Sequence, residues 1–190
     1  MSDEELLEKL RALVARMVGA LGEENVVTLD TLNQLGAELD ENGEYEDARK
    51  VSERCLRGRE KVLGEDHKDT LATVMNLGVV YKNLKDYEKA LEYYERALKG
   101  QEKTLGKTHP ETISTVMNIA IVYMQGLKDY GKAEELYHRA LEGYEAQLGK
   151  DHKNTMRCAE NYRNCLQCSG NSAGLIELKK SHPNVESYDT

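Results

Sequence analysis

Apolar residues recur every three or four positions along most of the chain, which is the spacing of a helix with one buried face. Near the start, this spacing predicts a helix over 3–20, with Leu6, Leu10 and Leu13 on its apolar face. It then predicts three first helices, near 27–42, 69–84 and 111–126, and three second helices, near 45–63, 87–105 and 130–148. A weaker pattern continues over 153–181. The chain is therefore expected to have an all-α fold.

The helical pattern repeats with a nearly fixed period. The dipeptide Leu-Gly recurs at 21, 63, 105 and 148, in steps of 42, 42 and 43 residues. Six residues after each glycine stands a threonine that is followed by an apolar residue. A period of this size is typical of stacked helix pairs, because one pair cannot bury its apolar face without its neighbours.

The same repeat predicts how successive pairs are joined. Each Leu-Gly dipeptide ends a predicted helix, so its glycine is expected to form a left-handed C-cap. In three copies a histidine follows that glycine, and we expect a structural role for it at the start of the next helix: these are His67, His109 and His152. The extra residue of the last period lies at Gly126, in the expected turn of the third pair, where an insertion costs least. Arg163 stands where earlier copies have glycine or alanine, which predicts a degenerate fourth pair.

The second and third copies resemble a known repeat family. The second copy carries Asn76-Leu77-Gly78 and Tyr81, then Tyr87, Ala90, Tyr94 and Ala97. The third carries Asn118-Ile119-Ala120 and Tyr123, then Tyr130, Ala133, Tyr137 and Ala140. These motifs resemble the tetratricopeptide repeat (TPR), in the 42-residue type of the kinesin light chains. The resemblance covers roughly 21–168, and the first copy departs from it at Gln34, Leu39 and Cys55.

The resemblance implies a right-handed superhelical solenoid of antiparallel helix pairs. A single domain is expected over 1–182, followed by a flexible tail over 183–190. The domain is expected to contain a capping helix, about three full repeats and a degenerate C-terminal repeat, at 3–20, 27–63, 69–105, 111–148 and 153–181.

Composition narrows the classes of partner. The chain has 34 acidic and 26 basic residues and a net charge of −8, which disfavours nucleic acids and anionic membranes. No apolar run approaches the roughly 20 residues that span a bilayer. The first five residues are acidic where a signal peptide would be basic. Four cysteines, three of them within 158–168, do not resemble a disulfide framework, and we predict a cytoplasmic protein.

In a solenoid of this kind the first helices line a concave groove, which predicts a binding surface for a peptide or a partner helix. The candidate groove residues are Gln34, Met75, Asn76, Val79, Lys82, Asn83, Met117, Asn118, Ile121, Met124, Gln125, Asn161 and Asn164. Four of them stand in one register and are called the amide row: Gln34, Asn76, Asn118 and Asn161. Side-chain amides can both donate to and accept from an extended peptide backbone. The alternative is that they bond the neighbouring helix and fix the geometry between repeats.

Charges along this surface are unevenly distributed. The first copy contributes Asp30, Asp40 and Glu41, which favour a basic residue in the ligand or, alternatively, form only a solvated face. Among the residues of the first helices that are not expected to pack, only Lys82 and Arg157 are cations, so tight binding of acidic peptides is not expected.

Other chemistry finds little support in the sequence. Equivalent histidines of successive pairs are separated by two helix layers and cannot converge on one zinc ion. Cys158, Cys165 and Cys168 could share a helix face as a zinc or redox site, although Cys165 matches the packing positions Val80 and Val122. No set of catalytic residues and no cofactor motif stands out. The sequence therefore predicts a non-enzymatic interaction module that needs no cofactor. It is expected to be a monomer or a weak homo-oligomer. The alternative is an assembly component that self-associates through its repeat ends.

Overall fold

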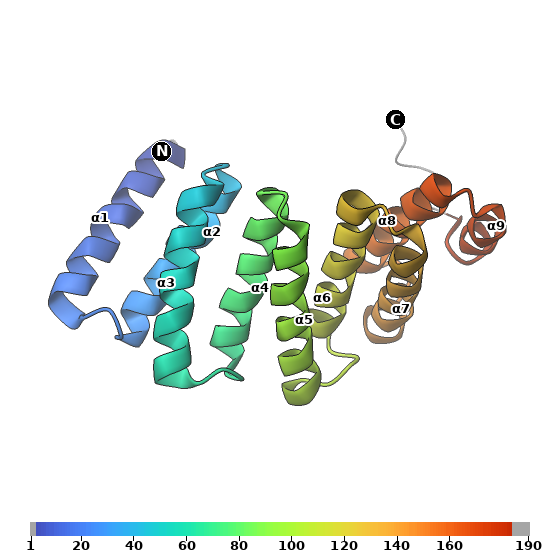
Figure 1. The fold of residues 1–190 in the computed structure, drawn as a ribbon. Coiled ribbons are helices and arrows are strands. Elements are labelled where there is room, and N and C mark those ends of the chain that lie inside the picture. The colour runs from blue at the N-terminus through green and yellow to red at the C-terminus, as the bar shows by residue number, and fades with distance from the viewer. Residues whose placement is uncertain (1–2, 184–190) are drawn as a thin grey trace. The chain divides into compact units, whose positions relative to one another are not determined.

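The computed structural model describes residues 3–183 as a succession of helices (Figure 1). The elements are α1 (Asp3–Leu21), α2 (Val26–Glu41), α3 (Tyr45–Leu63), α4 (Lys68–Asn83), α5 (Tyr87–Thr104), α6 (Pro110–Ile121), the π-helix η1 (Val122–Leu127), α7 (Tyr130–Leu148), α8 (Lys153–Ser169) and α9 (Ser172–Ser181). This part of the chain contains no strand, which confirms the all-α prediction, and the expected helix bounds were right to within one residue when α6 and η1 are taken together. The predicted flexibility of the tail over 183–190 falls on residues outside the described part, apart from Pro183.

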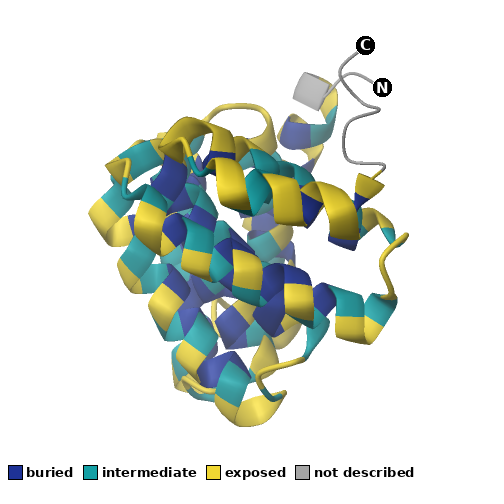
Figure 2. Ribbon diagram, turned by 90° about the vertical axis from the view of Figure 1, so that its right-hand side faces the viewer, coloured by how far each residue is buried: buried dark blue, intermediate teal, exposed yellow. Residues whose placement is uncertain are grey.

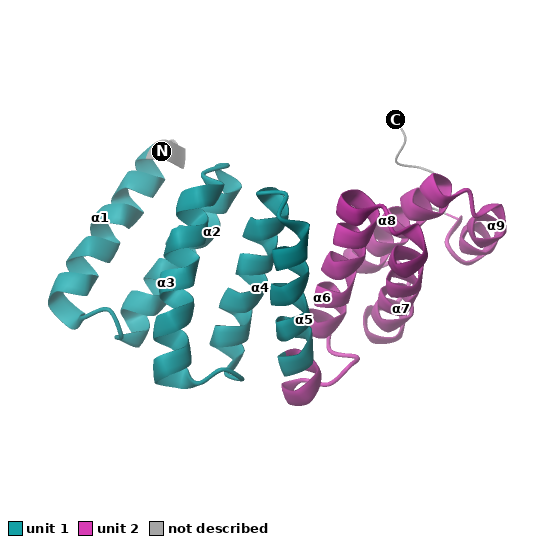
Figure 3. Cartoon of the chain, in the orientation of Figure 1, with its two compact units in different colours: residues 1–100 teal, residues 101–190 magenta. Residues whose placement is uncertain are grey.

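Contacts within the chain divide it into two compact units, residues 1–100 (unit 1) and 101–190 (unit 2), which Figure 3 shows in different colours. In unit 1, α1 packs on α2, α2 on α3 and α3 on α4. In unit 2, α6 packs on α7, α7 on α8 and α8 on α9. The single domain expected over 1–182 remains a prediction.

The core of unit 1 is made chiefly of leucine. Helix α1 contributes Leu7, Leu10 and Val14, and α2 contributes Leu29, Leu32, Leu35 and Leu39. Figure 2 shows buried residues on one face of the helices and exposed residues on the other, as the apolar spacing predicts. Helix α1 therefore covers the apolar face of α2, which is the expected role of a capping helix.

Glycines on the second helices let each pair pack closely. A Cβ atom added to Gly58 would lie 2.4 Å from Leu29, and one added to Gly100 would lie 2.4 Å from Leu71. In unit 2, a Cβ atom added to Gly143 would lie 2.8 Å from Ile113. The three glycines are in register, so the same apolar side chain of each first helix fills the space that glycine leaves on the second.

The connectors between pairs follow one design. The Nδ1 atoms of His67, His109 and His152 accept hydrogen bonds from backbone N–H groups two residues later, at 3.2, 3.3 and 3.2 Å. In the first copy Asn25 holds the same position and accepts from the N–H of Val27 at 3.0 Å. These side chains are N-caps, which confirms the structural role predicted for the histidines.

The glycine of each Leu-Gly dipeptide has a positive φ, as predicted, but the predicted type of cap was wrong. Gly64 has φ 92° and ψ 163°, and Gly149 has φ 84° and ψ 165°. These values lie in an extended region that is essentially restricted to glycine, rather than in the left-handed helical region. The chain therefore leaves each helix in an extended direction and turns at once toward the next N-cap.

The position of the inserted residue also differs from the expectation. In the first two turns, the N–H groups of Glu44 and Asp86 donate to carbonyls five residues earlier, but Asp129 donates to the carbonyl of Tyr123, six residues earlier. Lys128 has φ 57°, like Lys85 with φ 63°, so the turn itself is unchanged. The extra residue lies in the π-helix η1 at the end of the first helix, not in the turn.

The fourth pair is shorter than the others, as predicted. Its second helix, α9, has 10 residues, whereas α3 and α7 each have 19.

Candidate functional site

The predicted groove residues differ widely in exposure. In unit 1, Gln34 is exposed, and a half-buried group follows on α4: Met75, Asn76, Val79, Lys82 and Asn83. In unit 2, Gln125 and Asn164 are exposed, whereas Asn118, Ile121 and Asn161 are half-buried. Met117 and Met124 are only 3% and 9% exposed, so these two side chains offer little surface to a partner.

Two polar links join the first helices of unit 1. Near the middle of α2, the Oδ1 atom of Asn33 accepts from Asn76 Nδ2 at 3.4 Å and from Thr73 Oγ1 at 3.1 Å. Two helical turns further along, Asn83 Nδ2 donates to both carboxylate oxygens of Asp40, at 2.9 and 3.0 Å. The amide of Asn76 thus does what the alternative hypothesis expected of the amide row, since it bonds a neighbouring helix. Asn83, which lies outside that row, does the same.

A hollow of about 150 Å³ opens between these two links. Its lining residues are Gly36, Ala37, Asp40, Glu41, Asn76, Val79 and Val80. Of the predicted residues, the hollow brings together Asn76 and Val79, and it adds the two acidic residues of α2 that the sequence had singled out. Gly36 and Ala37 could have been recognised from their small size, because a hollow between helices needs small side chains on one wall.

Asp40 is the most perturbed carboxyl group of this hollow. Burial raises its pKa above 3.8, and the nearby carboxylate of Glu41 acts in the same direction. The hydrogen bond from Asn83 and the charge of Lys82 act against this rise. The hollow therefore contains a partly buried negative charge that its own cation only partly compensates.

The third acid that the sequence had singled out serves the fold. Asp30 accepts at Oδ1 from Arg59 Nη2 at 2.6 Å, and Arg59 is only 4% exposed. Arg59 also donates through Nη1 to the carbonyl of Asp69 at 2.7 Å and to Thr73 Oγ1 at 2.8 Å. Sequence reasoning missed this buried arginine, because Arg59 and its register equivalent Gln101 are both polar and only the structure shows that both are buried.

Two of the three cysteines considered as a zinc or redox site lie where packing predicts them, whereas Cys168 is exposed. Cys158 and Cys165 are fully buried, and each Sγ atom lies 3.8 Å from a backbone carbonyl of α7. Burial raises the pKa of both thiols to about 12, so they are neutral at physiological pH. Over residues 3–183, no group of three or more His, Cys, Asp or Glu side chains is arranged to hold a metal ion.

The apolar face of α1 is largely used within unit 1. Leu10 is 6% exposed and belongs to the core, whereas Leu13 is 42% exposed. Of the three leucines predicted on the apolar face of the first helix, only Leu13 is exposed and could contribute to self-association through this end, since Leu6 packs partly against the core. Among the described helices, none has a stretch that is both long and apolar enough to cross a membrane.

Comparisons with known proteins agree with this arrangement of helices. A family model described as tetratricopeptide repeat matches residues 27–103, 69–126 and 111–173. No curated protein matches the chain.

Several solved structures share the fold. A kinesin light chain-like protein from Podosopora anserina with nearly identical TPR-like repeats superposes with a TM-score of 0.83 at 22% identity, covering 97% of this chain and 87% of that one. BtubC (BKLC) from P. vanneervenii has a TM-score of 0.77 at 18% identity, with 95% and 74% covered. MamA from Desulfovibrio magneticus has a TM-score of 0.62 at 15% identity, with 97% of both chains covered. These similarities establish the type of helical repeat.

Proposed function

The chain belongs to the tetratricopeptide repeat family, a family of protein–protein interaction scaffolds, and from this premise we propose that its first helices hold an extended peptide segment of a partner protein. Proteins of this fold are typically non-enzymatic, so binding is the activity to measure. The observation that carries the proposal is the hollow between α2 and α4 in unit 1.

The size of this hollow favours a single side chain over a small molecule. Its volume of about 150 Å³ is below the range of roughly 300–1,000 Å³ that is usual for small-molecule sites. Ala37, Val79 and Val80 provide an apolar wall, and Asn76 lies beside them with its carbonyl oxygen available as an acceptor. An extended segment can place one side chain in the hollow and its backbone along the side-chain amide of Asn76.

The charge of the hollow favours a lysine or arginine at that position of the ligand. The carboxylates of Asp40 and Glu41 both line the hollow. Lysine and arginine can lay their aliphatic stems along the apolar wall while their charged ends reach the carboxylates. An arriving cation would also stabilise the ionised carboxylate of Asp40, and so oppose the rise in pKa that burial causes.

Unit 2 has its own first-helix surface, which we include in the proposal. Ile121 and Gln125 lie on α6 and η1, and Asn161 and Asn164 lie on α8. The exposed amides of Gln125 and Asn164 are suited to bonding a peptide backbone.

A peptide library displayed against the purified chain, followed by fluorescence anisotropy with the best binders, would test the proposal. Val79→Arg fills the hollow with a long cation, and we expect it to weaken binding by about tenfold or more. Glu95→Ala, at an exposed position of α5, is the matched control and should bind as the unchanged chain does. Binders without a basic residue, or full affinity in the Val79→Arg variant with an unchanged melting temperature, would contradict the proposal.

We also propose a cytoplasmic location, which the four free thiols favour because cytoplasmic proteins rarely form disulfides. Fluorescence microscopy of a tagged chain in its native cell would test this, and a signal confined to a secretory compartment would contradict it.

A further inference from the structure

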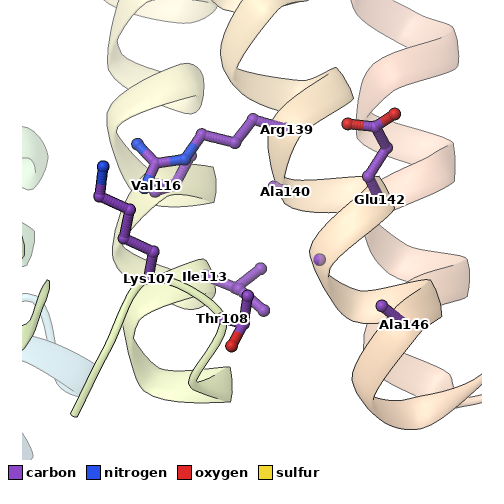
Figure 4. Close-up of a pocket in the computed structure, with 9 residues that line it drawn as sticks. Lys107, Thr108, Ile113, Val116, Arg139, Ala140, Glu142 and Ala146 are labelled. Carbon is purple, nitrogen blue, oxygen red and sulfur yellow. The ribbon is translucent and has the colours of Figure 1, made fainter.

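A second and larger hollow lies within unit 2, between α6, the connector before it, and α7 (Figure 4). Its volume is about 270 Å³. Its lining residues are Lys107, Thr108, Ile113, Val116, Arg139, Ala140, Glu142, Gly143 and Ala146. None of them belongs to the candidate groove, and five lie on the second helix of the pair.

The hollow has an apolar floor and a polar rim. Ile113, Val116 and Ala140 form the floor and are 3%, 1% and 1% exposed. Lys107 and Thr108 lie on the rim and are exposed. An apolar group that entered from solvent would therefore meet aliphatic surface at the bottom and a charged group at the edge.

The first repeat has different residues at two positions that line this hollow. Thr108 and Ala146 stand in register with Glu24 and Lys61 of unit 1, which form an ion pair there. Two long side chains thus bridge the first repeat at the point where the third repeat has a threonine and an alanine. No such bridge can form between Thr108 and Ala146, which line this hollow.

The charged residues on the rim of the hollow also differ between the repeats. Lys107 stands in register with Glu65 and Glu23, so the sign of the rim is reversed in the third repeat. Arg139 pairs with Glu102, as Arg96 pairs with Glu60 in unit 1. Lys107 has no ion-pair partner among residues 3–183, so its charge is the one that remains uncompensated.

Figure 4 shows how these charges are arranged around the hollow. The ends of Lys107 and Arg139 lie on the same side of it, whereas the carboxylate of Glu142 points away. The rim thus presents positive charge at one side of an apolar depression.

We propose that this hollow binds a segment of a partner protein in which a large apolar side chain is followed by a carboxylate. The apolar side chain occupies the floor between α6 and α7, and the carboxylate pairs with Lys107. The site lies apart from the candidate groove and differs from it in charge. The hollow between α2 and α4 is acidic, whereas this hollow is basic. Nucleic acid is a poor alternative, since a chain of net charge −8 offers it two cations here, one of them already paired.

Titration of the ¹⁵N-labelled chain with capped dipeptides, followed by NMR, tests this site directly. The probes are N-acetyl-Leu-Glu-amide and its matched control N-acetyl-Leu-Lys-amide. We expect Leu-Glu to shift the backbone amide signals of Lys107, Thr108 and Gly143, and to bind several times more tightly than Leu-Lys. Equal shifts with both probes, shifts confined to the groove residues, or no shift at about 10 mM peptide would overturn the proposal.

Variants that copy the first repeat provide the second test. Thr108→Glu combined with Ala146→Lys rebuilds the bridge at no change in net charge, and should weaken Leu-Glu binding about tenfold because the floor is covered. Lys107→Glu copies Glu65 and should reverse the preference toward Leu-Lys. Glu135→Lys, at an exposed position of α7, is the control and should bind Leu-Glu as before. Unchanged binding in the bridged variant, with its fold verified by circular dichroism, would refute the site.

Discussion

At the scale of single residues, small side chains decide how closely the helices of a pair approach. Gly100 faces Leu71, which is only 3% exposed. By contrast, Gly19 lies on the exposed side of α1, and a Cβ atom added there would have no other atom within 4 Å. The two positions have the same residue for different reasons, because only Gly100 makes room for a neighbour.

The variant Gly100→Ala is therefore expected to destabilise the chain by about 1–3 kcal/mol, since its Cβ atom overpacks the contact with Leu71. Gly19→Ala should instead raise the free energy of unfolding by about 0.5–1 kcal/mol, because alanine is the better helix former. Urea denaturation of both variants measures the difference. A stabilising Gly100→Ala change would show that the helix pair can separate without cost.

The histidine N-caps give a second prediction for single residues. His67→Ala removes the acceptor of the Asp69 N–H group and should cost about 1 kcal/mol. His67→Asn copies the cap that Asn25 provides in the first copy, so it should retain most of the stability. Equal losses in the two variants would indicate that the imidazole contributes by packing and not by capping.

At the scale of elements, the π-helix η1 shows that a helix can absorb an inserted residue without altering the turn that follows. The left-handed Lys128 is equivalent to Lys85, and Lys132 stacks over Tyr123 as Lys89 stacks over Tyr81. The helix end is adaptable because π-helical hydrogen bonds accommodate one more residue within the same turn.

Deletion of Gly126 should accordingly convert η1 into α-helix and leave the fold intact. The remaining sequence, Tyr-Met-Gln-Leu-Lys-Asp-Tyr, matches the second copy from Tyr81 to Tyr87 in length and in its turn residues. We expect the melting temperature to stay equal or to rise. A loss of cooperative unfolding in the deletion variant would show that the π-helix is required by its surroundings.

The short helix α9 is expected to respond to pH through the residue that follows it. The side chain of His182 is 1% exposed, with Nε2 3.2 Å from Glu145 of α7. Burial lowers its pKa below 6.5, with Lys150 acting in the same direction and Glu145 and Asp151 against it. Because the depressed pKa favours neutral histidine in the fold, this stabilisation is present above pH 6.5 and is lost as the pH falls through the lower value.

Melting temperatures between pH 8 and pH 5 should therefore fall more for the unchanged chain than for a His182→Gln variant. Hydrogen exchange should locate the loss at α9 and the adjoining part of α7. A pH dependence that is identical in the two proteins would assign the effect to other groups.

At the scale of the whole molecule, stability in a repeat protein is a sum of contacts between neighbouring elements. Helix α1 packs chiefly on α2, and Leu10 belongs to their shared core with 6% exposure. A destabilising substitution of Leu10 should therefore affect only the neighbouring helices, because contacts in the rest of the chain do not depend on it.

Leu10→Ala should lower the stability of the first helices by about 2–5 kcal/mol, as expected for a large-to-small change in a core. Hydrogen exchange should show loss of protection in α1 and α2, with α7 and α8 unchanged. Leu13→Ala is the matched control, since Leu13 is 42% exposed, and should be nearly neutral. A uniform loss of protection over all helices would mean that the chain unfolds as one cooperative body.

Much of the architecture followed from the sequence alone. The helices, their order and their ends were predictable because apolar spacing, glycines and caps act over a few residues, and the period of 42 repeats these local signals. The candidate groove was less predictable. Asn76 and Val79 line the hollow, whereas Met117 and Met124, which lie at the corresponding face of the third copy, are buried.

The tertiary structure alone decided which partner each polar side chain has. Asn83 bonds Asp40, and Arg59 bonds Asp30, across 43 and 29 residues of sequence. The two hollows likewise depend on which side chains meet between adjacent helices, such as the missing counterpart of the Glu24–Lys61 pair at Thr108 and Ala146. A repeating sequence determines the helices because their hydrogen bonds are local, but a binding surface is formed by residues from different helices, and only packing brings these together.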